Sequence, residues 1–149
     1  MIRLVNVSKT YNGAAGRVAA LLDVSLDVAD GEFVALMGPS GCGKSTLLHL
    51  VGAVDLPTSG EVWVDGMELT RLSDAALSRF RRDRVGIVYQ FYNLLPTLST
   101  WENVSLPALL AGASPRSARE RAIELLHAVG VLERAEHWPH ELSGGEMQR

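Results

Sequence analysis

The chain has 149 residues, which is within the size range of a single domain. An apolar share of 47% and a charged share of 21% describe a soluble globular protein with enough apolar material for a core. The net charge of −3 and the pI near 5.8 argue against a nucleic-acid-binding protein, which would need a basic surface, so we expect no nucleic-acid partner.

Three segments alternate apolar and polar residues, which is the pattern of strands with one exposed face. They are Ile2–Tyr11, Ala20–Val28 and Glu61–Asp65, and we expect them to form an antiparallel layer, with turns at Asn12–Gly16 and Asp65-Gly66. Because Met1-Ile2-Arg3 leads straight into the first strand, we expect no signal peptide.

A glycine-rich loop follows a predicted buried strand in the first half of the chain. Asp30-Gly31 turns into Glu32–Met37, a nearly all-apolar run that predicts a strand buried on both faces. The phosphate loop, residues 38–46, matches the pattern G-x-x-x-x-G-K-[ST] with the sequence Gly38-Pro39-Ser40-Gly41-Cys42-Gly43-Lys44-Ser45-Thr46. Ser45–Val51 is then predicted to be a helix whose positive N-terminal end faces the same loop.

The residue types of the phosphate loop suit the binding of a nucleotide. Its glycines free the backbone to curl, so that N–H groups can line a nest for anionic oxygens. Lys44 supplies a point charge for the β- and γ-phosphates, and Ser45 supplies a hydroxyl for Mg²⁺. A glycine-rich surface turn is the alternative, but the order of strand, loop and helix favours a nucleotide site. Cys42 is the only cysteine, so no disulfide forms within the chain and a reducing cytoplasm is compatible.

The middle of the chain predicts a capped helix and a second buried strand. Ser73 is the expected cap of a helix that runs to about Arg82. Aspartates flank the basic cluster in this helix, which favours a solvated helix face; its members are Arg79, Arg81, Arg82 and Arg84. Val85–Tyr89 is expected to be a short buried strand, and Gln90 follows it directly.

The region Trp101–His140 is predicted to be helical. Ser114 and Pro115 open an amphipathic helix that ends at Gly130 and has one apolar face, formed by Ala118, Ala122, Leu125, Leu126 and Val129. The longest apolar stretch, residues 104–113, is far shorter than the roughly 18 residues that span a bilayer. We therefore expect membrane association only through a partner. The histidines lack metal-ligand spacing, so a surface or interface position is expected for His127, His137 and His140.

The tail segment, Leu142–Arg149, predicts a second anion site. Ser143 and Glu146 form an S-x-x-E capping box, which predicts the start of a helix. Gly144 and Gly145 place bare backbone amides in or near its first turn, and such a helix end can bind an anion. An ordinary helix N-terminus after a glycine turn is the alternative interpretation.

A phosphate loop alone does not distinguish a kinase, a GTPase and a transport ATPase, but the tail segment does. Because it contains both a phosphate loop and this tail segment, the chain resembles the nucleotide-binding subunits of ATP-binding cassette (ABC) proteins along its whole length. The tail segment is similar to their signature motif. The resemblance implies an α/β fold, a P-loop NTPase of the ABC ATPase type, with a partial parallel core sheet, an antiparallel β layer and a helical subdomain. These parts correspond to residues 1–90 for the ATP-binding core and β layer, 91–142 for the helical subdomain and 143–149 for the start of the signature helix.

The resemblance also implies roles for single residues. The run Gln90–Val104 is similar to the family's Q-loop, whose glutamine reaches Mg²⁺ and the attacking water. Tyr11 sits where the family places an aromatic ring under adenine, although a tyrosine packed at a strand end is the alternative. In the family, the signature helix meets the γ-phosphate held by the opposite subunit, so that two ATP molecules join a homodimer.

The resemblance therefore gives a set of candidate site residues. Those expected to bind ATP are Tyr11, Gly38, Pro39, Ser40, Gly41, Cys42, Gly43, Lys44, Ser45, Thr46, Gln90, Ser143, Gly144 and Gly145. Catalytic roles are expected for Lys44 and Gln90, and Mg²⁺ ligation for Ser45 and Gln90.

The family pattern continues beyond what these residues contain. It has a strand ending in an Asp that holds Mg²⁺, a Glu that polarises water, and a later strand with a His that senses the γ-phosphate. In this class of ATPase both strands lie between the two predicted buried strands, 32–37 and 85–89. We therefore expect a truncated copy or a partial record of a larger ATPase, with C-terminal core strands missing. Residues 1–149 alone are expected to be poorly soluble or partly unfolded and to show no ATPase activity.

Within the family, Asp55–Val62 and Arg84–Thr97 look most like the lipoprotein-release and macrolide-export branch. The implied function is the ATP-binding subunit of a bacterial ABC export or extraction complex, which couples ATP binding and hydrolysis to a transmembrane permease. It implies a cytoplasmic protein on the inner face of the plasma membrane. One alternative is an ABC-type ATPase that controls a cell-division or envelope complex without transport. Another is a nucleotide-binding fragment that does not hydrolyse ATP.

Overall fold

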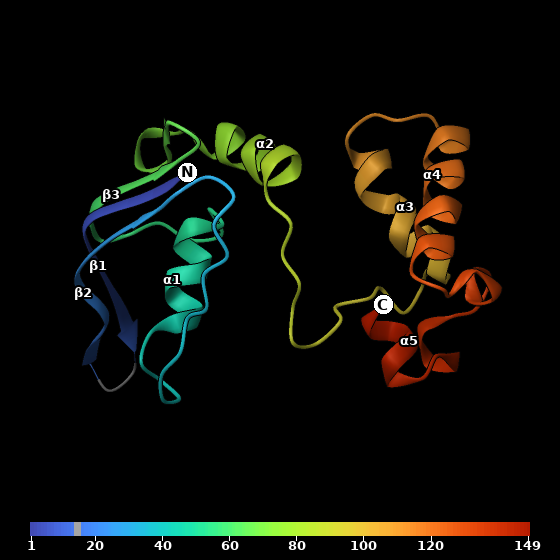
Figure 1. Cartoon of the computed structure of the whole chain (residues 1–149), viewed down its shortest axis with the longest axis horizontal. Helices are drawn as coiled ribbons and strands as arrows, with labels where there is room; N and C mark the ends of the chain where they lie inside the picture. The colour runs from blue at the N-terminus through green and yellow to red at the C-terminus, as the bar shows by residue number, and fades with distance from the viewer. Residues whose placement is uncertain (14–15) are drawn as a thin grey trace. The chain divides into compact units, whose positions relative to one another are not determined.

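The computed structural model describes residues 1–13 and 16–149, and the chain divides into two compact units, Met1–Gly86 and Ile87–Arg149 (Figure 1). Each unit has its own secondary structure. The first contains β1 (Ile2–Gly13), β2 (Gly16–Val28), α1 (Lys44–Val51), β3 (Ser59–Val64), β4 (Met67–Glu68), the short 3-10 helix η1 (Leu69–Arg71) and α2 (Asp74–Arg84). The second contains α3 (Thr100–Leu110), α4 (Pro115–Ala128), the 3-10 helices η2 (Leu132–Arg134) and η3 (Pro139–Glu141), and α5 (Gly144–Gln148).

The four strands form one antiparallel sheet in the order β2-β1-β3-β4, which confirms the predicted antiparallel layer. Ile2 pairs with Val28 of β2 on one side and with Val64 of β3 on the other. β2 begins at Gly16, earlier than predicted, and β4 was not predicted. Residues 14–15 of the predicted turn at Asn12–Gly16 lie outside the described residues.

The register between β1 and β2 shifts at three places, between Leu4 and Val7, between Val7 and Lys9, and between Lys9 and Thr10. Asn6 and Asp23 both have positive φ angles, of 49° and 50°, which Asn and Asp adopt more readily than other non-glycine residues. The side-chain amide of Asn6 donates to Asp23 Oδ1 at 2.9 Å. Beyond Asn6, β1 alternates regularly, so Val7, Lys9 and Tyr11 share one face of the strand.

The core of the first unit lies between the sheet and the two helices α1 and α2. Its buried members are Leu4, Val7, Leu21, Leu47, Leu50, Ala53, Val62, Leu69, Leu77 and Phe80. The N-cap predicted at Ser73 is confirmed, because Ser73 Oγ accepts a hydrogen bond from Ala76 N at 3.4 Å. Leu77 and Phe80 face the core, and the basic cluster of α2 is mostly exposed, as predicted.

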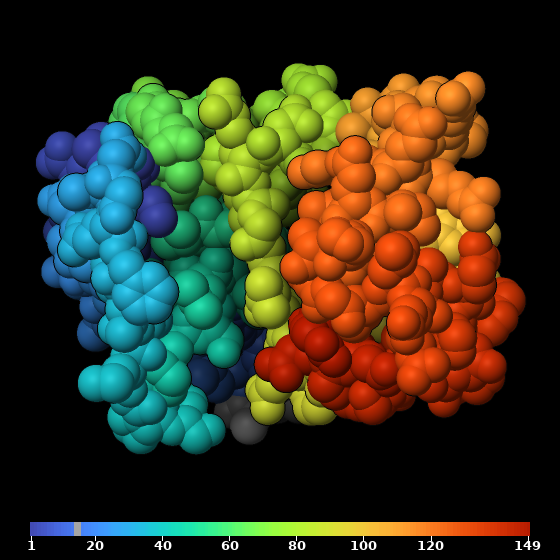
Figure 2. Space-filling model, turned by 45° about the vertical axis from the view of Figure 1, so that its right-hand side comes forward, coloured from blue at the N-terminus to red at the C-terminus, as the bar shows by residue number. Residues whose placement is uncertain are grey.

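The two predicted buried strands are not formed. Residues 32–37 and 85–89 belong to no strand among the described residues, and their side chains are mostly exposed. Phe33 is 95% exposed and Val88 is 91% exposed. In Figure 2 the light-blue to cyan part of the chain that contains residues 32–37 covers one face of the first unit. An apolar run becomes a strand only where a ladder partner pairs with it, and no described segment pairs with either run.

In the second unit α3 and α4 pack together around Leu126, Val131 and Ala135, with Trp101, Val104 and Ile123 against them. The predicted start of α4 is confirmed: Ser114 Oγ accepts from Ser117 N at 3.2 Å, and Pro115 is the first helical residue. Ala118, Ala122 and Leu126 are buried as predicted, but Leu125 and Val129 are about 40% exposed. The prediction is wrong for these two because the chain returning through residues 131–135 covers α4 on the side of Leu126.

None of the helices in the described ranges combines the length and apolar character needed to cross a membrane. Within residues 1–13 and 16–149 there is also no group of three or more His, Cys, Asp or Glu side chains arranged to hold a metal ion. His127 and His140 are exposed and His137 is half-buried, in line with the surface positions predicted for them.

Candidate functional site

The phosphate loop leads directly into α1. Gly43 is the N-cap of α1 with φ 92° and ψ 2°, and its carbonyl accepts the first helical bond from Leu47 N at 2.9 Å. Lys44 is the first helical residue, and Leu47 and Leu50 anchor the helix in the core. Because the first turn of an α-helix leaves N–H groups without helical acceptors, this end of α1 suits anionic oxygens.

The glycine at position 43 is required by a close approach of two backbones. A Cβ atom there would lie 2.5 Å from Ala20 O and 2.9 Å from Leu21 Cδ2, so the loop rests directly on β2. Gly41 also has a positive φ, of 81°, but a Cβ there would meet no atom within 4 Å. Gly41 therefore serves backbone conformation alone, whereas Gly43 serves both backbone conformation and close contact with β2.

We expect Gly43→Ala to destabilise the first unit far more than Gly41→Ala. Gly41→Ala should lower the free energy of unfolding by about 1–2 kcal/mol, which is the cost of holding an alanine in the left-handed conformation. Gly43→Ala adds a clash with the backbone of Ala20, for a total of about 2–5 kcal/mol. Urea denaturation of the two variants and the wild-type protein measures the difference. Equal losses of unfolding free energy in the two variants would show that the phosphate loop does not pack tightly against β2.

Lys44 reaches back over the phosphate loop. Its Nζ donates to Gly38 O at 2.8 Å and to Pro39 O at 2.7 Å, and lies 3.6 Å from Cys42 Sγ. The ammonium group is thus held at the loop itself, and Ser45 follows it as an exposed residue in the first turn of α1. A cation and a hydroxyl beside free helix amides form a donor set that fits a metal-bound polyphosphate.

Tyr11 lies near the end of β1 and is 39% exposed. Its hydroxyl donates to Asp55 Oδ2 at 2.9 Å, and Lys9 Nζ donates to Asp55 Oδ1 at 2.6 Å. Burial raises the pKa of Asp55, but the hydrogen bonds from Lys9 and Tyr11 outweigh this effect and hold the pKa below its ordinary value. Asp55 is therefore ionised at neutral pH.

In the second unit, Gln90 is exposed in the segment that precedes α3. The same segment contacts the tail segment, since Tyr92 Oη lies 3.6 Å from the position that a Cβ on Gly144 would occupy. Asn103 of α3 fixes the end of this segment: it accepts from Leu95 N at 2.8 Å and donates to three backbone carbonyls, those of Leu95, Leu98 and Ser99.

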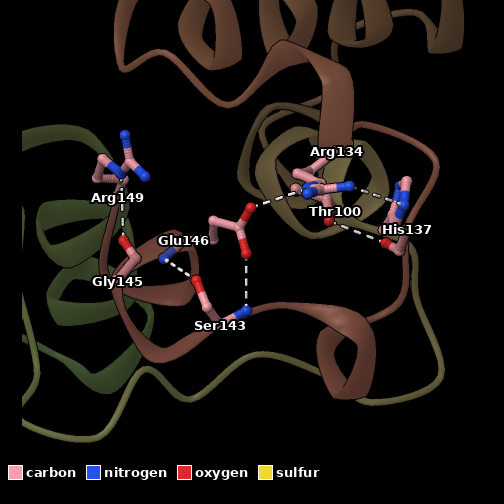
Figure 3. Close-up of polar contacts among 7 residues, drawn as sticks. All are labelled: Thr100, Arg134, His137, Ser143, Gly145, Glu146 and Arg149. Atoms are coloured by element: carbon pink, nitrogen blue, oxygen red, sulfur yellow. Dashed lines mark hydrogen bonds and ion pairs between the residues drawn. The ribbon is translucent and has the colours of Figure 1, made fainter.

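The tail segment begins a helix as predicted (Figure 3). Ser143 Oγ accepts from Glu146 N at 3.3 Å, and Ser143 N donates to Glu146 Oε2 at 2.8 Å, so both bonds of the capping box are present. The other carboxylate oxygen of Glu146 accepts from Arg134 Nε at 2.8 Å. This ion pair fixes the start of α5 to η2, and Gly144 and Gly145 follow in the first turn of α5.

The ionisation of Glu146 is shifted by this environment. The hydrogen bond from Arg134, with those from Ser143, lowers the pKa of Glu146 from its ordinary 4.5 to about 2. Because the folded-state pKa is depressed, ionised Glu146 stabilises the fold above pH 4.5, and this contribution is lost as the pH falls toward 2.

We expect NMR titration of the Glu146 carboxyl group to give a midpoint near 2 in the full-length protein. Arg134→Gln should move the midpoint up toward 4.5, because it removes the guanidinium that stabilises the carboxylate. Arg121→Gln, which breaks an ion pair with Glu124 in α4, should leave the midpoint unchanged. A wild-type midpoint at 4.5 would contradict the Arg134–Glu146 pair.

The candidate site residues fall in both units. The first unit brings together the phosphate loop and α1 and also holds Tyr11, while Gln90 and residues 143–145 belong to the second. Neither the pairing of Tyr11 with Lys9 and Asp55 nor the pairing of Glu146 with Arg134 was predicted from the sequence. The segment Asp55–Val62 was noted only for its similarity to the lipoprotein-release and macrolide-export branch. Its contact with Tyr11 spans 44 positions of the sequence.

Comparisons with known proteins agree with this geometry. Residues 21–149 match the family model described as ABC transporter. An uncharacterized ABC transporter ATP-binding protein of Thermotoga maritima is 46% identical over 149 residues, and the match covers all of this chain and 64% of the relative. The lipoprotein-releasing system ATP-binding protein LolD of Xanthomonas axonopodis pv. citri is 48% identical, with 100% and 61% covered.

Solved structures give the same result. The ATP-binding cassette MJ0796, in a dimeric post-hydrolysis state bound to ADP and Pi, is similar with a TM-score of 0.90 and 42% identity. The match covers 99% of this chain and 65% of that one. A second dimeric structure of MJ0796, described as a bacterial ABC transporter cassette, also has a TM-score of 0.90, at 43% identity. The chain thus spans less than two thirds of the length of these relatives.

Proposed function

Because the chain belongs to the ABC transporter family, we propose that it is the ATP-binding subunit of a bacterial ABC export or extraction complex. The observation that carries the proposal is the phosphate loop, in which Gly43 caps α1 and Lys44 lies over the loop carbonyls. Relatives named as lipoprotein-releasing ATP-binding proteins, 48% identical over the whole chain, favour extraction of lipid-modified cargo.

The residues of the first unit fit ATP with Mg²⁺. The N–H groups of the phosphate loop and the Lys44 ammonium would bind the β- and γ-phosphates, and the Ser45 hydroxyl would ligate Mg²⁺. Tyr11 offers a half-exposed ring for the base. Bound Mg²⁺ supplies charge neutralisation for phosphoryl transfer, and Gln90 is proposed as a further ligand and as the residue that positions water.

The tail segment is proposed to complete the site of a second copy. Its capping box holds the amides of Gly144 and Gly145 at the exposed start of α5. MJ0796 is described as dimeric in two solved structures, which supports a homodimer that forms on ATP binding. The helical unit is proposed to contact a transmembrane permease, which would keep the protein on the inner face of the plasma membrane.

Purification from native membranes tests this function. Tagged full-length protein should bring down a permease, and the complex should hydrolyse ATP faster than the isolated subunit. Recovery of cell-division proteins without a permease would favour an ABC-type ATPase that controls such a complex. If the protein fails to bind ATP in a calorimetric titration, the proposal is wrong in every form.

A further inference from the structure

Three side chains form a charged cluster at the end of β1. The Asp55 carboxylate accepts from Lys9 Nζ at 2.6 Å through one oxygen and from Tyr11 Oη at 2.9 Å through the other. The Lys9 ammonium also lies 5.0 Å from the centroid of the Tyr11 ring. Lys9 is largely buried, with 13% of its side chain exposed, and Asp55 has 32% exposed. A partly buried ion pair of this kind is screened less by solvent than a surface pair.

The cluster leaves the Tyr11 ring oriented but accessible. Val7, Lys9 and Tyr11 share one face of β1, and along this row the side chains pass from fully buried to half-exposed. The hydroxyl of Tyr11 is fixed by Asp55, and one face of the ring is occupied by the Lys9 cation. A planar ligand can therefore stack only on the other face.

The same cluster connects β1 to the far end of the phosphate-loop helix. Asp55 lies just beyond α1, and its N–H donates to His49 O at 3.3 Å. Lys9 Nζ donates to Leu56 O at 2.6 Å as well, so two adjacent residues of the segment that follows α1, Asp55 and Leu56, are held by β1. At its other end α1 begins at Gly43, against Ala20 and Leu21, and Leu21 pairs with Lys9 in the sheet. Both ends of α1 are thus tied to the strand pair that carries Tyr11.

We propose that Asp55 and Lys9 are positioning residues that hold the Tyr11 ring as a preformed stacking surface for the purine base of the nucleotide. The inference rests on the proposed function, since Tyr11 meets a base only if the protein binds ATP. Asp55 and Lys9 do not touch the nucleotide themselves. They act by fixing the ring before binding, which removes the entropy cost of ordering it in the complex.

Paired titrations with Mg-ATP and Mg-tripolyphosphate separate contacts to the base from contacts to the phosphates. Asparagine has no negative charge and one acceptor oxygen in place of two, so Asp55→Asn loses the ion pair with Lys9 and cannot accept from Lys9 and Tyr11 through separate oxygens. We expect Asp55→Asn in the full-length protein to lower ATP affinity about three- to tenfold. This loss is smaller than the whole contribution of base stacking to ATP affinity. The affinity for tripolyphosphate should not change. Tyr11→Phe, which keeps the ring and loses the hydroxyl, should lower ATP affinity in the same way, and the double variant no further.

A matched control is Asp27→Asn, which breaks an exposed ion pair with Arg3 at 3.6 Å on the same sheet and should alter neither affinity. Unchanged ATP affinity in Asp55→Asn, or an equal loss for ATP and tripolyphosphate, would overturn the inference. If Asp55→Asn does not fold, Tyr11→Phe decides by the same two criteria. A wild-type protein that binds tripolyphosphate as tightly as ATP would show that the base has no site here. One that binds neither would overturn the proposed function, and this inference with it.

Discussion

We expect Lys44→Ala to lower the affinity of the full-length protein for Mg-ATP by about tenfold or more. The Lys44 ammonium lies at the phosphate loop, within hydrogen-bond distance of Gly38 O and Pro39 O. A hydrogen bond to a charged group contributes roughly 1.5–3 kcal/mol, and 1.4 kcal/mol corresponds to a factor of ten in affinity. Alanine keeps the helical conformation at the first position of α1, so the loss reports the charge.

Isothermal titration calorimetry measures this loss, with the unfolding midpoint recorded for each variant. Lys44→Ala also removes two bonds to the loop, so a change in stability must be separated from the change in affinity. Arg3→Ala is the control, because Arg3 is an exposed cation of the same unit that forms an ion pair with Asp27 at the surface. ATP affinity that survives Lys44→Ala intact would rule out the phosphate role of this lysine.

We expect Gly145→Asp to abolish the proposed ATP-dependent dimer and to leave ATP binding by the monomer nearly intact. The variant introduces a carboxylate where the proposed dimer places the γ-phosphate of the partner's ATP. At 4 Å and an effective dielectric constant of 20, two unit charges repel by about 4 kcal/mol, roughly a thousandfold in each site. The fold tolerates the change, because a Cβ on Gly145 meets no atom within 4 Å and its φ is not positive.

Light scattering with a slowly hydrolysed ATP analogue follows the dimer. Gly145→Asn has the same size without the charge, so it should dimerise better than Gly145→Asp. A similar loss of dimerisation in both variants would show that the size of the new side chain, and not its charge, causes the effect. A dimer that persists in Gly145→Asp would show that the tail segment is only a helix cap. A fall in monomer ATP binding would contradict a role restricted to the opposite subunit.

The local elements of this fold were predictable from short stretches of sequence. Helix starts at Ser73, Ser114 and Ser143 follow from capping chemistry that involves only the next three residues, and all three caps are formed. The phosphate loop likewise depends on its own glycines and on the helix that follows it. The alternating strands were found too, although their ends were displaced by a few residues.

Features that depend on distant partners were not predictable in this way. Residues 32–37 have the composition of a buried strand, but strand formation requires a ladder that no local pattern supplies. The pairing of Tyr11 with Asp55 spans 44 positions, and the ion pair of Lys9 with Asp55 spans 46. The exposure of Leu125 is decided by which side of α4 residues 131–135 cover.

The strand order β2-β1-β3-β4 has a consequence for synthesis on the ribosome. The β1–β2 hairpin can close once Val28 has emerged, but Ile2 also pairs with Val64. This second pairing closes a circuit of about 60 residues that contains the phosphate loop and α1, and long circuits close late and at an entropic cost. Until then one edge of β1 exposes unpaired N–H and C=O groups to other chains. In the nascent protein, the part most open to misassembly is this edge of β1 rather than the phosphate loop.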